Sequence, residues 1–392
     1  MDEKLFFIAD CLREEEPMTV ICARHGISRQ TGYELKRRYL ASGVAGLEER
    51  SRAPHHRPQT TPDMIVDLLV DLRREHPRWG PKKLLPILRK RHPSIVFPAV
   101  STAGDILKRA GLIEETRRRR RPIAVERPFN AVEQPNDTWC IDFKGWFRTR
   151  DGTRCDPLTV TDAFSRYLLI CEIMPEQTEA VRVAVDCLFS EYGLPLAMRS
   201  DNGAPFGGSG PAGLSRLSVH WLKLGLRLER IAPGKPQQNG QHERMHKTLK
   251  EDTTQPPADT AAEQQQRFEA FRRLYNTERP HEALDQTPPA DHYRSSPRSM
   301  PSRVEEPWYD ANHEVRRVRT SGEIKWRGGT YFVSETLVGE PVGITETASG
   351  HSVVRFAGID LGIIDPRKER FQPFTPPRPG RRNAEKTPTA AE

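Results

Sequence analysis

The sequence lacks long apolar runs and lacks the cysteine patterns of disulfide-rich or zinc-binding proteins. No apolar stretch approaches the roughly 18 residues of a membrane-spanning helix, and no basic segment followed by an apolar one opens the chain. We therefore expect no secretory signal, no membrane partner and a cytoplasmic location. Cysteine occurs six times, without a CxxC pair or zinc-finger spacing, which predicts reduced thiols; the positions are Cys11, Cys22, Cys140, Cys155, Cys171 and Cys187.

Positive charge, by contrast, is in excess. The 392 residues include 61 Lys and Arg against 53 Asp and Glu, which gives a net charge of +8. The excess of positive charge favours a polyanionic binding partner, and nucleic acid is the leading candidate. The alternative is a basic surface that binds no polyanion. A hydrophobic share of 36% with 29% charged residues is typical of a globular chain, and this length predicts about two to four domains.

The first 50 residues predict a helix-turn-helix domain (1–50). Pro17–His25 is typical of one helix, Gly26 and Ile27 of a tight turn, and Ser28 of the cap of a second helix from Arg29 to Leu40. The second helix would bring polar side chains to a DNA major groove, and an ordinary helical hairpin with a solvated basic face is the alternative. These side chains belong to Ser28, Arg29, Gln30, Lys36 and Arg37.

A second helical domain is predicted for residues 61–113, with a helix-turn-helix as one possibility. Apolar residues recur at helical spacing after residue 62, and a further helix over Lys82–Arg91 should be kinked at Pro86. A basic linker (114–134) follows, whose arginine run is either solvated or grips the DNA backbone. The run consists of Arg117, Arg118, Arg119, Arg120 and Arg121.

Alternating strands and helices predict an α/β domain over residues 135–290, with a mixed five-stranded sheet. The expected strands are 138–147, 157–161, 167–173, 197–200 and 226–231, and the expected helices are 178–191, 214–224, 238–252 and 261–275. Short alternating strands with glycine turns then predict a small β-barrel at 308–365. The tail, 366–392, is rich in Pro and Arg and is expected to be disordered.

Three acidic residues stand out in the α/β region. Asp142 lies in an apolar strand pattern, where an ionised carboxylate costs several kcal/mol unless something compensates it. Asp201 follows the fourth strand, and Glu243 opens a helix, so both can approach the same end of the sheet. Three carboxylates form a hard-oxygen site suited to Mg²⁺, and in a basic chain this indicates two-metal phosphodiester chemistry. Asp162 and Glu251 are the alternatives for the first and third positions.

At these positions the chain resembles the integrase-core (DDE) transposases, the superfamily of retroviral integrases and bacterial insertion-sequence transposases. The resemblance rests on Trp139–Asp142, Ser200–Gly203 and Pro236–Glu243, and the helix-turn-helix front favours the insertion-sequence branch. It implies an RNase H-like core, an acidic triad of Asp142, Asp201 and Glu243, and two Mg²⁺ ions that Mn²⁺ can replace. It also implies that Lys247 and Lys250 contact the transferred DNA end, with a solvated basic face as the alternative.

One feature departs from the family pattern. The count of residues between Asp201 and Glu243 is 243 − 201 − 1 = 41, more than the family usually has. The glycine-rich stretch Gly207–Gly213 is expected to absorb the excess.

The implied function is metal-dependent cleavage of element ends and strand transfer by in-line displacement, on the bacterial nucleoid. Its partner is double-stranded DNA, both terminal repeats and target, and pairing of ends implies a homo-oligomer. Two alternatives remain: a nuclease with the same core that does not transfer strands, and an inactive or domesticated DNA-binding protein.

Overall fold

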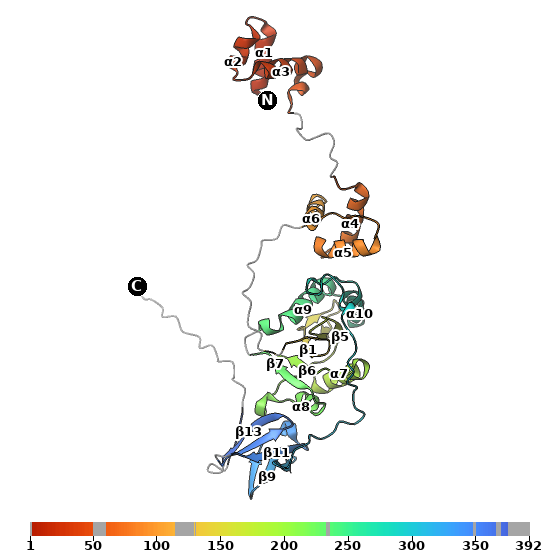
Figure 1. Ribbon diagram of the computed structural model, residues 1–392, viewed down its shortest axis with the longest axis vertical. Helices are drawn as coiled ribbons and strands as arrows, with labels where there is room; N and C mark the ends of the chain where they lie inside the picture. The colour runs from red at the N-terminus through yellow and green to blue at the C-terminus, as the bar shows by residue number, and fades with distance from the viewer. Residues whose placement is uncertain are drawn as a thin grey trace, which may run out of the picture. The chain divides into compact units, whose positions relative to one another are not determined.

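The computed structural model describes residues 2–49, 60–113, 129, 131–232, 236–347, 350–365 and 370–374. The chain divides into two compact units, Met1–Asp63 and Met64–Glu392, and each is described by itself (Figure 1). The predicted arginine run from Arg117 to Arg121 lies outside the described residues. Within the described ranges, no helix has both the length and the apolar character to cross a membrane.

The N-terminal unit contains the helices α1 (Asp2–Arg13), α2 (Met18–Arg24) and α3 (Arg29–Ser42), followed by the short 3-10 helix η1 (Gly43–Leu47). The turn before α3 passes through Gly26, whose φ of 64° lies in the left-handed region that favours glycine. Ser28 caps α3 by accepting a hydrogen bond from the Thr31 backbone N–H at 3.1 Å. The predicted helix-turn-helix is confirmed, and α1 completes its core, which contains Phe7, Ile8, Cys11, Ile21, Cys22, Leu35 and Leu47.

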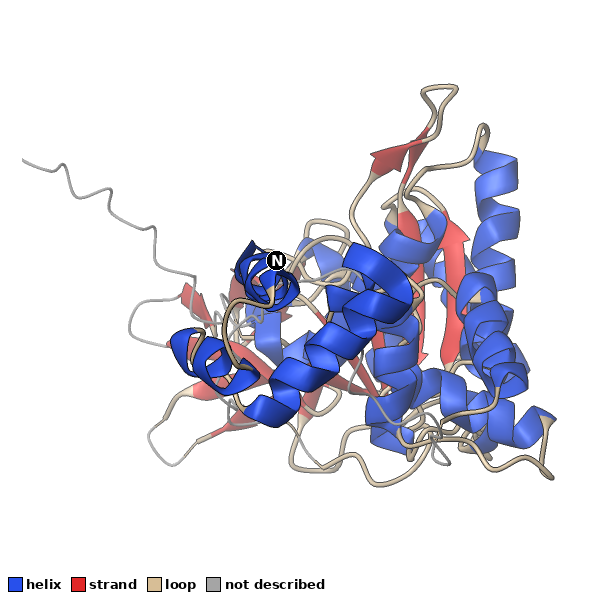
Figure 2. Ribbon diagram, turned by 90° about the horizontal axis from the view of Figure 1, so that it is seen from above, coloured by secondary structure: helices blue, strands red, loops and turns tan. Residues whose placement is uncertain are grey.

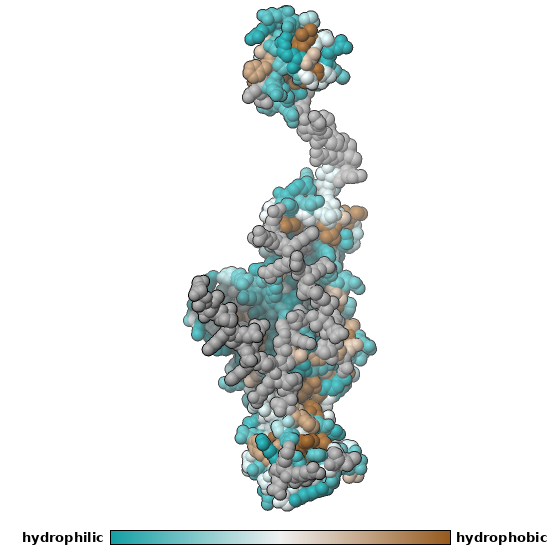
Figure 3. All heavy atoms as spheres, turned by 90° about the vertical axis from the view of Figure 1, so that its left-hand side faces the viewer, coloured by the Kyte–Doolittle hydropathy of each residue, from teal (hydrophilic) through white to brown (hydrophobic). Residues whose placement is uncertain are grey.

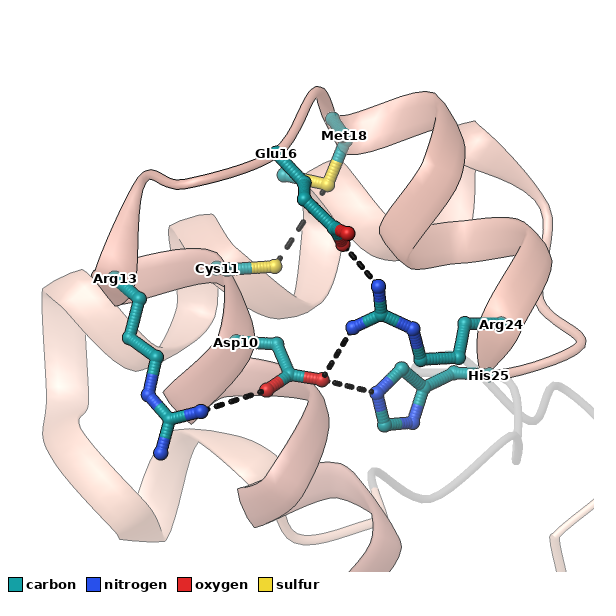
Figure 4. A network of polar contacts seen from close by, with 7 residues as sticks. All are labelled: Asp10, Cys11, Arg13, Glu16, Met18, Arg24 and His25. Carbon is teal, nitrogen blue, oxygen red and sulfur yellow. Dashed lines mark hydrogen bonds and ion pairs between the residues drawn. The ribbon is translucent and has the colours of Figure 1, made fainter.

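A polar network holds the end of α1 against the end of α2 (Figure 4). The Asp10 carboxylate accepts hydrogen bonds from His25 Nε2 at 3.0 Å and from Arg24 at 3.4 Å, and Arg24 also pairs with Glu16. The hydrogen bond from His25 is the main cause of the lowered pKa of Asp10. Because Arg24 and His25 directly precede the turn, the network fixes the direction in which the chain enters α3. The face of this unit seen in Figure 3 is mostly hydrophilic.

The second unit begins with a helical bundle of α4 (Asp63–Glu75), α5 (Pro81–Arg91) and α6 (Val100–Arg109). Helix α5 is continuous through Pro86, where the sequence predicts a kink. Apolar residues at helical spacing meet in a separate core, which confirms the predicted helical region; the core includes Leu69, Leu72, Trp79, Leu84, Leu88 and Leu107.

A mixed five-stranded sheet forms the centre of this unit, in the order β5-β4-β1-β6-β7. Its strands are β1 (Thr138–Phe143), β4 (Pro157–Asp162), β5 (Leu168–Ile173), β6 (Ala197–Ser200) and β7 (Arg227–Arg230). Strand β4 is antiparallel to both β1 and β5, whereas β1, β6 and β7 run parallel. The order and directions confirm the predicted RNase H-like core with a mixed sheet.

The first strand is shorter than predicted. It was expected to extend to residue 147 but ends at Phe143, because Gly145 with φ of 84° turns the chain away from the sheet. A small hairpin follows, made of β2 (Phe147–Arg148) and β3 (Arg154–Cys155).

Helices cover both faces of the sheet (Figure 2). On one face, α7 (Thr178–Tyr192) and α8 (Arg216–Lys223) pack against residues such as Trp139. On the other face, α9 (Gly240–Thr253) and α10 (Ala261–Thr277) pack against Leu168 and Cys171 of β5. Short 3-10 helices occur between these elements and beyond them; they are η2 (Pro211–Gly213), η3 (Pro236–Asn239), η4 (Glu282–Leu284), η5 (Pro289–Asp291) and η6 (Glu335–Leu337).

The C-terminal strands form an open sheet and a hairpin. The sheet has the order β14-β13-β12-β11-β8, and β9 pairs only with β10 among the described strands. The sheet therefore does not close on itself there, and the predicted small β-barrel is not confirmed. The strands are β8 (Glu314–Arg317), β9 (Glu323–Trp326), β10 (Gly329–Phe332), β11 (Pro341–Glu346), β12 (Ser352–Phe356), β13 (Ile359–Asp365) and β14 (Arg370–Pro373).

Strand β14 lies inside the segment that the sequence predicts to be disordered. It pairs antiparallel with β13 and buries Phe371, which is 7% exposed, in the hydrophobic core of the C-terminal strands β8 to β14, hereafter the β-domain. The prediction was wrong for these residues because a four-residue strand with one large apolar side chain shows no alternating hydrophobic pattern. Pairing with β13 is what holds the segment in an extended conformation.

The glycine-rich loop between β6 and α8 contacts the β-domain. A Cβ atom on Gly207 or Gly208 would meet a backbone oxygen at 2.4 or 2.5 Å, so the loop packs closely against its own flanks. Its Ala212 N–H donates to the Phe374 carbonyl at 2.7 Å. Leu214, just after the loop, is buried together with β-domain residues. The glycine-rich loop thus takes part in a contact between the central domain and the β-domain.

Candidate active site

Asp142 lies near the end of the central strand β1, with 28% of its side chain exposed. Burial is the main cause that raises its pKa, to about 7, and Asp201 and Glu243 add to the effect. A backbone hydrogen bond from Phe143 and the charge of Lys144 act in the opposite direction. A half-buried carboxylate surrounded by other carboxylates is a group that a cation would stabilise.

Strand pairing explains why Asp201 is near. Strands β1 and β6 are parallel neighbours with Cys140 opposite Arg199, so the residues two further along, Asp142 and Asp201, leave the sheet at the same edge. Asp201 is exposed, and its Oδ1 accepts the Gly203 N–H at 3.1 Å in an Asx turn. The turn directs the chain away and leaves the carboxylate outside the sheet.

Helix α9 brings the third carboxylate. Glu243 is exposed in its first turn, whereas Met245 and Leu249 on the opposite side are buried against β5 and α10. The charge of Glu243 acts on Asp142 and raises the pKa of that residue. Asp142, Asp201 and Glu243, which are distant in sequence, therefore share one electrostatic environment.

Two histidines that sequence reasoning missed, His242 and His246, lie beside Asp142. The Thr159 hydroxyl on β4 lies 2.8 Å from His242 Nε2 and 2.6 Å from His246 Nε2, and the Thr161 hydroxyl lies 2.8 Å from His242 Nδ1. Burial lowers the pKa of His242 to about 3 and that of His246 to about 2, so both rings are neutral. Ligand atoms of His242, His246 and Asp142 lie within 4.8 Å of one another. The four-residue spacing of the histidines on the apolar face of α9 was the signal that could have found them.

The two alternative carboxylates have other partners. Asp162 is fully buried and accepts hydrogen bonds from Asn136 N at 2.7 Å and from Ser165 N at 2.7 Å, so it stabilises the turn that leads into β5. Glu251 lies 3.5 Å from Arg78 and 3.8 Å from Lys247. Neither carboxylate is among the main charges that act on Asp142.

The lysines of α9 are exposed, as a DNA contact requires. Lys247 and Lys250 are both at the surface, and Lys250 lowers the pKa of half-buried Lys144, after burial itself. Lys144 also interacts with Asp142, so the pair Lys144 and Lys250 places positive charge beside the carboxylates. Lys144 was not predicted as a site residue, because a lysine just after a strand carries no distinctive signal.

The residues of α3 that we predict to contact DNA bases differ in how exposed they are and in whether they have partners within the protein. Arg29 and Gln30 are exposed at the start of the helix, and Arg37 is exposed near Glu34 at 3.8 Å. The Lys36 ammonium instead donates to the Cys11 carbonyl at 3.4 Å and is half-buried. The Ser28 oxygen is occupied as the helix cap. The first turn of α3 thus presents the freest polar side chains.

Comparison with known proteins follows the same division of the chain. Residues 132–236 and 224–289 each match a family described as integrase core domain. Residues 3–55 match a helix-turn-helix domain, and residues 31–107 match a homeodomain-like domain. The matched integrase segments contain all three clustered carboxylates.

Similar proteins come from insertion elements. The uncharacterized 39.2 kDa protein of insertion element IS476 of Xanthomonas euvesicatoria is 29% identical over 268 residues, 64% of this chain and 70% of that protein. The uncharacterized 31.7 kDa protein of IS407 of Burkholderia multivorans is 28% identical over 262 residues, 64% of this chain and 88% of that protein. The HTLV-2 integrase catalytic core, solved with magnesium, is 14% identical and covers 41% of this chain and 98% of that one; its TM-score of 0.33 is too low to add weight.

Proposed function

The chain belongs to the integrase-core transposases of insertion elements, and we propose that it cuts and joins DNA ends at Asp142, Asp201 and Glu243. The reaction class is polynucleotidyl transfer. The observation that carries the proposal is the strand register that places Asp142 and Asp201 at the same end of the sheet, with Glu243 in the first turn of α9 and near enough for its charge to raise the pKa of Asp142.

The residues fit a divalent cation. Three carboxylates offer the oxygen ligands that Mg²⁺ prefers, and Mn²⁺ accepts the same set. The charges of Asp201 and Glu243 both act on Asp142, and the three residues would together hold two divalent ions. Bound divalent ions supply Lewis acidity that activates water or a DNA 3′-OH and stabilises the leaving oxygen. No side chain needs to form a covalent bond to DNA.

Basic residues around the carboxylates would position the DNA. Exposed Lys247 and Lys250 lie on the helix that carries Glu243, where ammonium groups can contact phosphates of the element end. In the N-terminal unit, Arg29 and Gln30 at the start of α3 would contact base edges in the terminal repeats. Pairing of two element ends would require more than one copy of the chain.

Strand transfer by purified protein on the ends of its own element, with Mg²⁺, tests the proposal. Asp142→Asn, Asp201→Asn and Glu243→Gln should each abolish cleavage and joining while DNA affinity stays near wild type, because no cationic contact is removed. Glu251→Gln is the matched control and should retain activity. Joining by Glu243→Gln but not by Glu251→Gln would show that the third carboxylate is misassigned.

The same assay separates the alternatives. Cleavage without joining would indicate a nuclease, and DNA binding without either reaction would indicate an inactive DNA-binding protein. Ca²⁺ should support DNA binding without catalysis, since its looser coordination does not fix in-line geometry. Full activity in excess chelator would refute a metal mechanism.

A further inference from the structure

In the hydrogen-bond network beside Asp142, the chemistry of the partners determines which atom is the donor in each bond. The Thr159 hydroxyl on β4 lies 3.1 Å from the backbone carbonyl of Asp142 and contacts the Nε2 atoms of both His242 and His246. A threonine hydroxyl carries one proton and two lone pairs, whereas a carbonyl can only accept. The Thr159 proton therefore goes to the carbonyl, and both imidazoles donate to Thr159 through Nε2–H.

With both rings protonated at Nε2, each Nδ1 carries a lone pair. The lone pair of His242 accepts the hydroxyl proton of Thr161 at 2.8 Å. The lone pair of His246 has no hydrogen-bond partner in the part of the chain that the structure describes, and it faces Asp142 Oδ2 at 3.9 Å. Two electron-rich atoms thus lie near each other at the rim of the sheet, an arrangement that a cation bound between them would stabilise.

We propose that His246 Nδ1 is a nitrogen ligand of the metal ion that Asp142 binds. This inference rests on the function proposed above and changes the character of its site from all-oxygen to mixed nitrogen and oxygen. The separation of 3.9 Å is shorter than two metal–ligand bonds of roughly 2.1 Å each, so one ion can contact both atoms. His242 is not a ligand, because both its ring nitrogens already form hydrogen bonds to threonine hydroxyls.

A nitrogen ligand changes which metal the site prefers. Mg²⁺ gains little from imidazole, whereas affinity for first-row transition ions rises along the series that begins with Mn²⁺. The site should therefore bind Mn²⁺ more tightly than Mg²⁺ by more than three carboxylates alone would give. The outer ring nitrogen of His246 would be held in place by Thr159, as second-layer partners of metal-bound histidines are.

His246→Asn is the sharpest test, since the amide oxygen of asparagine stands near the position of Nδ1 and replaces a nitrogen donor with an oxygen donor. Spin-echo modulation of bound Mn²⁺ in the full-length protein should detect a directly coordinated ¹⁴N, and the signal should disappear in this variant. Titration calorimetry should show Mn²⁺ affinity lowered by about tenfold or more, with Mg²⁺ affinity nearly unchanged. His242→Asn, one helical turn earlier and also a partner of Thr159, is the control and should keep the ¹⁴N signal.

The outcomes separate this inference from the function on which it rests. Mn²⁺ that binds in an Asp142-dependent way without ¹⁴N coupling would overturn the role of His246 and leave the proposed function intact. Mn²⁺ affinity that Asp142→Asn does not weaken would overturn both. The wild-type spectrum alone can refute the nitrogen ligand, so the test does not depend on how well any variant folds.

Discussion

Replacing Asp142 with asparagine should stabilise the metal-free protein, although the same change should abolish activity. The pKa of Asp142 is raised from 3.8 to about 7, mainly by burial and then by Asp201. The native state therefore binds this proton more tightly than the unfolded state, and stability falls as pH rises between those two values. A shift of about three pKa units corresponds to about 4 kcal/mol at most. Because 28% of the side chain is exposed and solvent screens it, we expect about 2 kcal/mol.

Urea unfolding of wild type and Asp142→Asn in excess chelator, over pH 3 to 8, measures this effect. The free energies of unfolding should differ least near pH 3, below the unfolded-state pKa of 3.8, where the carboxylate is mostly protonated in both states, and the variant should gain stability relative to wild type progressively toward pH 8. Since the chain has two units, the relevant transition is the one that Mg²⁺ shifts in wild type, and Mg²⁺ should not shift it in the variant. A difference that does not vary with pH, or a variant that is less stable at pH 8, would refute the electrostatic reasoning.

Four further variants test other parts of the molecule. Asp162→Ala should lower the free energy of unfolding by roughly 3 kcal/mol, because two backbone donors lose their buried partner, while calorimetry should find Mg²⁺ affinity unchanged. Replacing Arg29 and Gln30 together with alanine should reduce the preference for element ends over scrambled duplex by about tenfold in fluorescence anisotropy. Lys247→Ala and Lys250→Ala should each weaken binding to both duplexes and reduce the slope of log affinity against log salt by about one.

Most of the fold could be predicted from the sequence because local signals agree with the tertiary structure. Ser28 after a glycine turn, the apolar strand that contains Asp142, and the amphipathic helices of the core all keep their predicted places. The errors occur where a neighbouring element decides the outcome. Strand β14 is ordered by pairing with β13, and closure of the C-terminal sheet depends on how its edge strands meet, which no local pattern encodes.

The three carboxylates could be chosen from the sequence because Asp142 lies in an apolar strand pattern, where a charge is costly, and because Asp201 and Glu243 lie in motifs that resemble those of the integrase-core family. The histidines could not, because His242 and His246 at helical spacing among Met245 and Leu249 look like an ordinary buried helix face. Their significance depends on Thr159, which lies 83 and 87 positions away in sequence and is brought beneath them by the pairing of β4 with β1. Residues that act through such a contact have no sequence signature of their own.

The same network explains how a helix and a strand can hold carboxylates in a fixed relation. Thr159 on β4 bonds to the backbone of Asp142 on β1 and to both histidines of α9, the helix that carries Glu243. Apolar contacts such as that of Leu249 stabilise the helix on the sheet but permit small sliding, whereas directional hydrogen bonds at 2.6 to 3.1 Å define one position. Loss of Thr159 should therefore disturb the spacing of Asp142 and Glu243 more than it disturbs the packing of α9. The buried polar groups of Thr159, His242 and His246 therefore set the relative positions of Asp142 and Glu243 in the site.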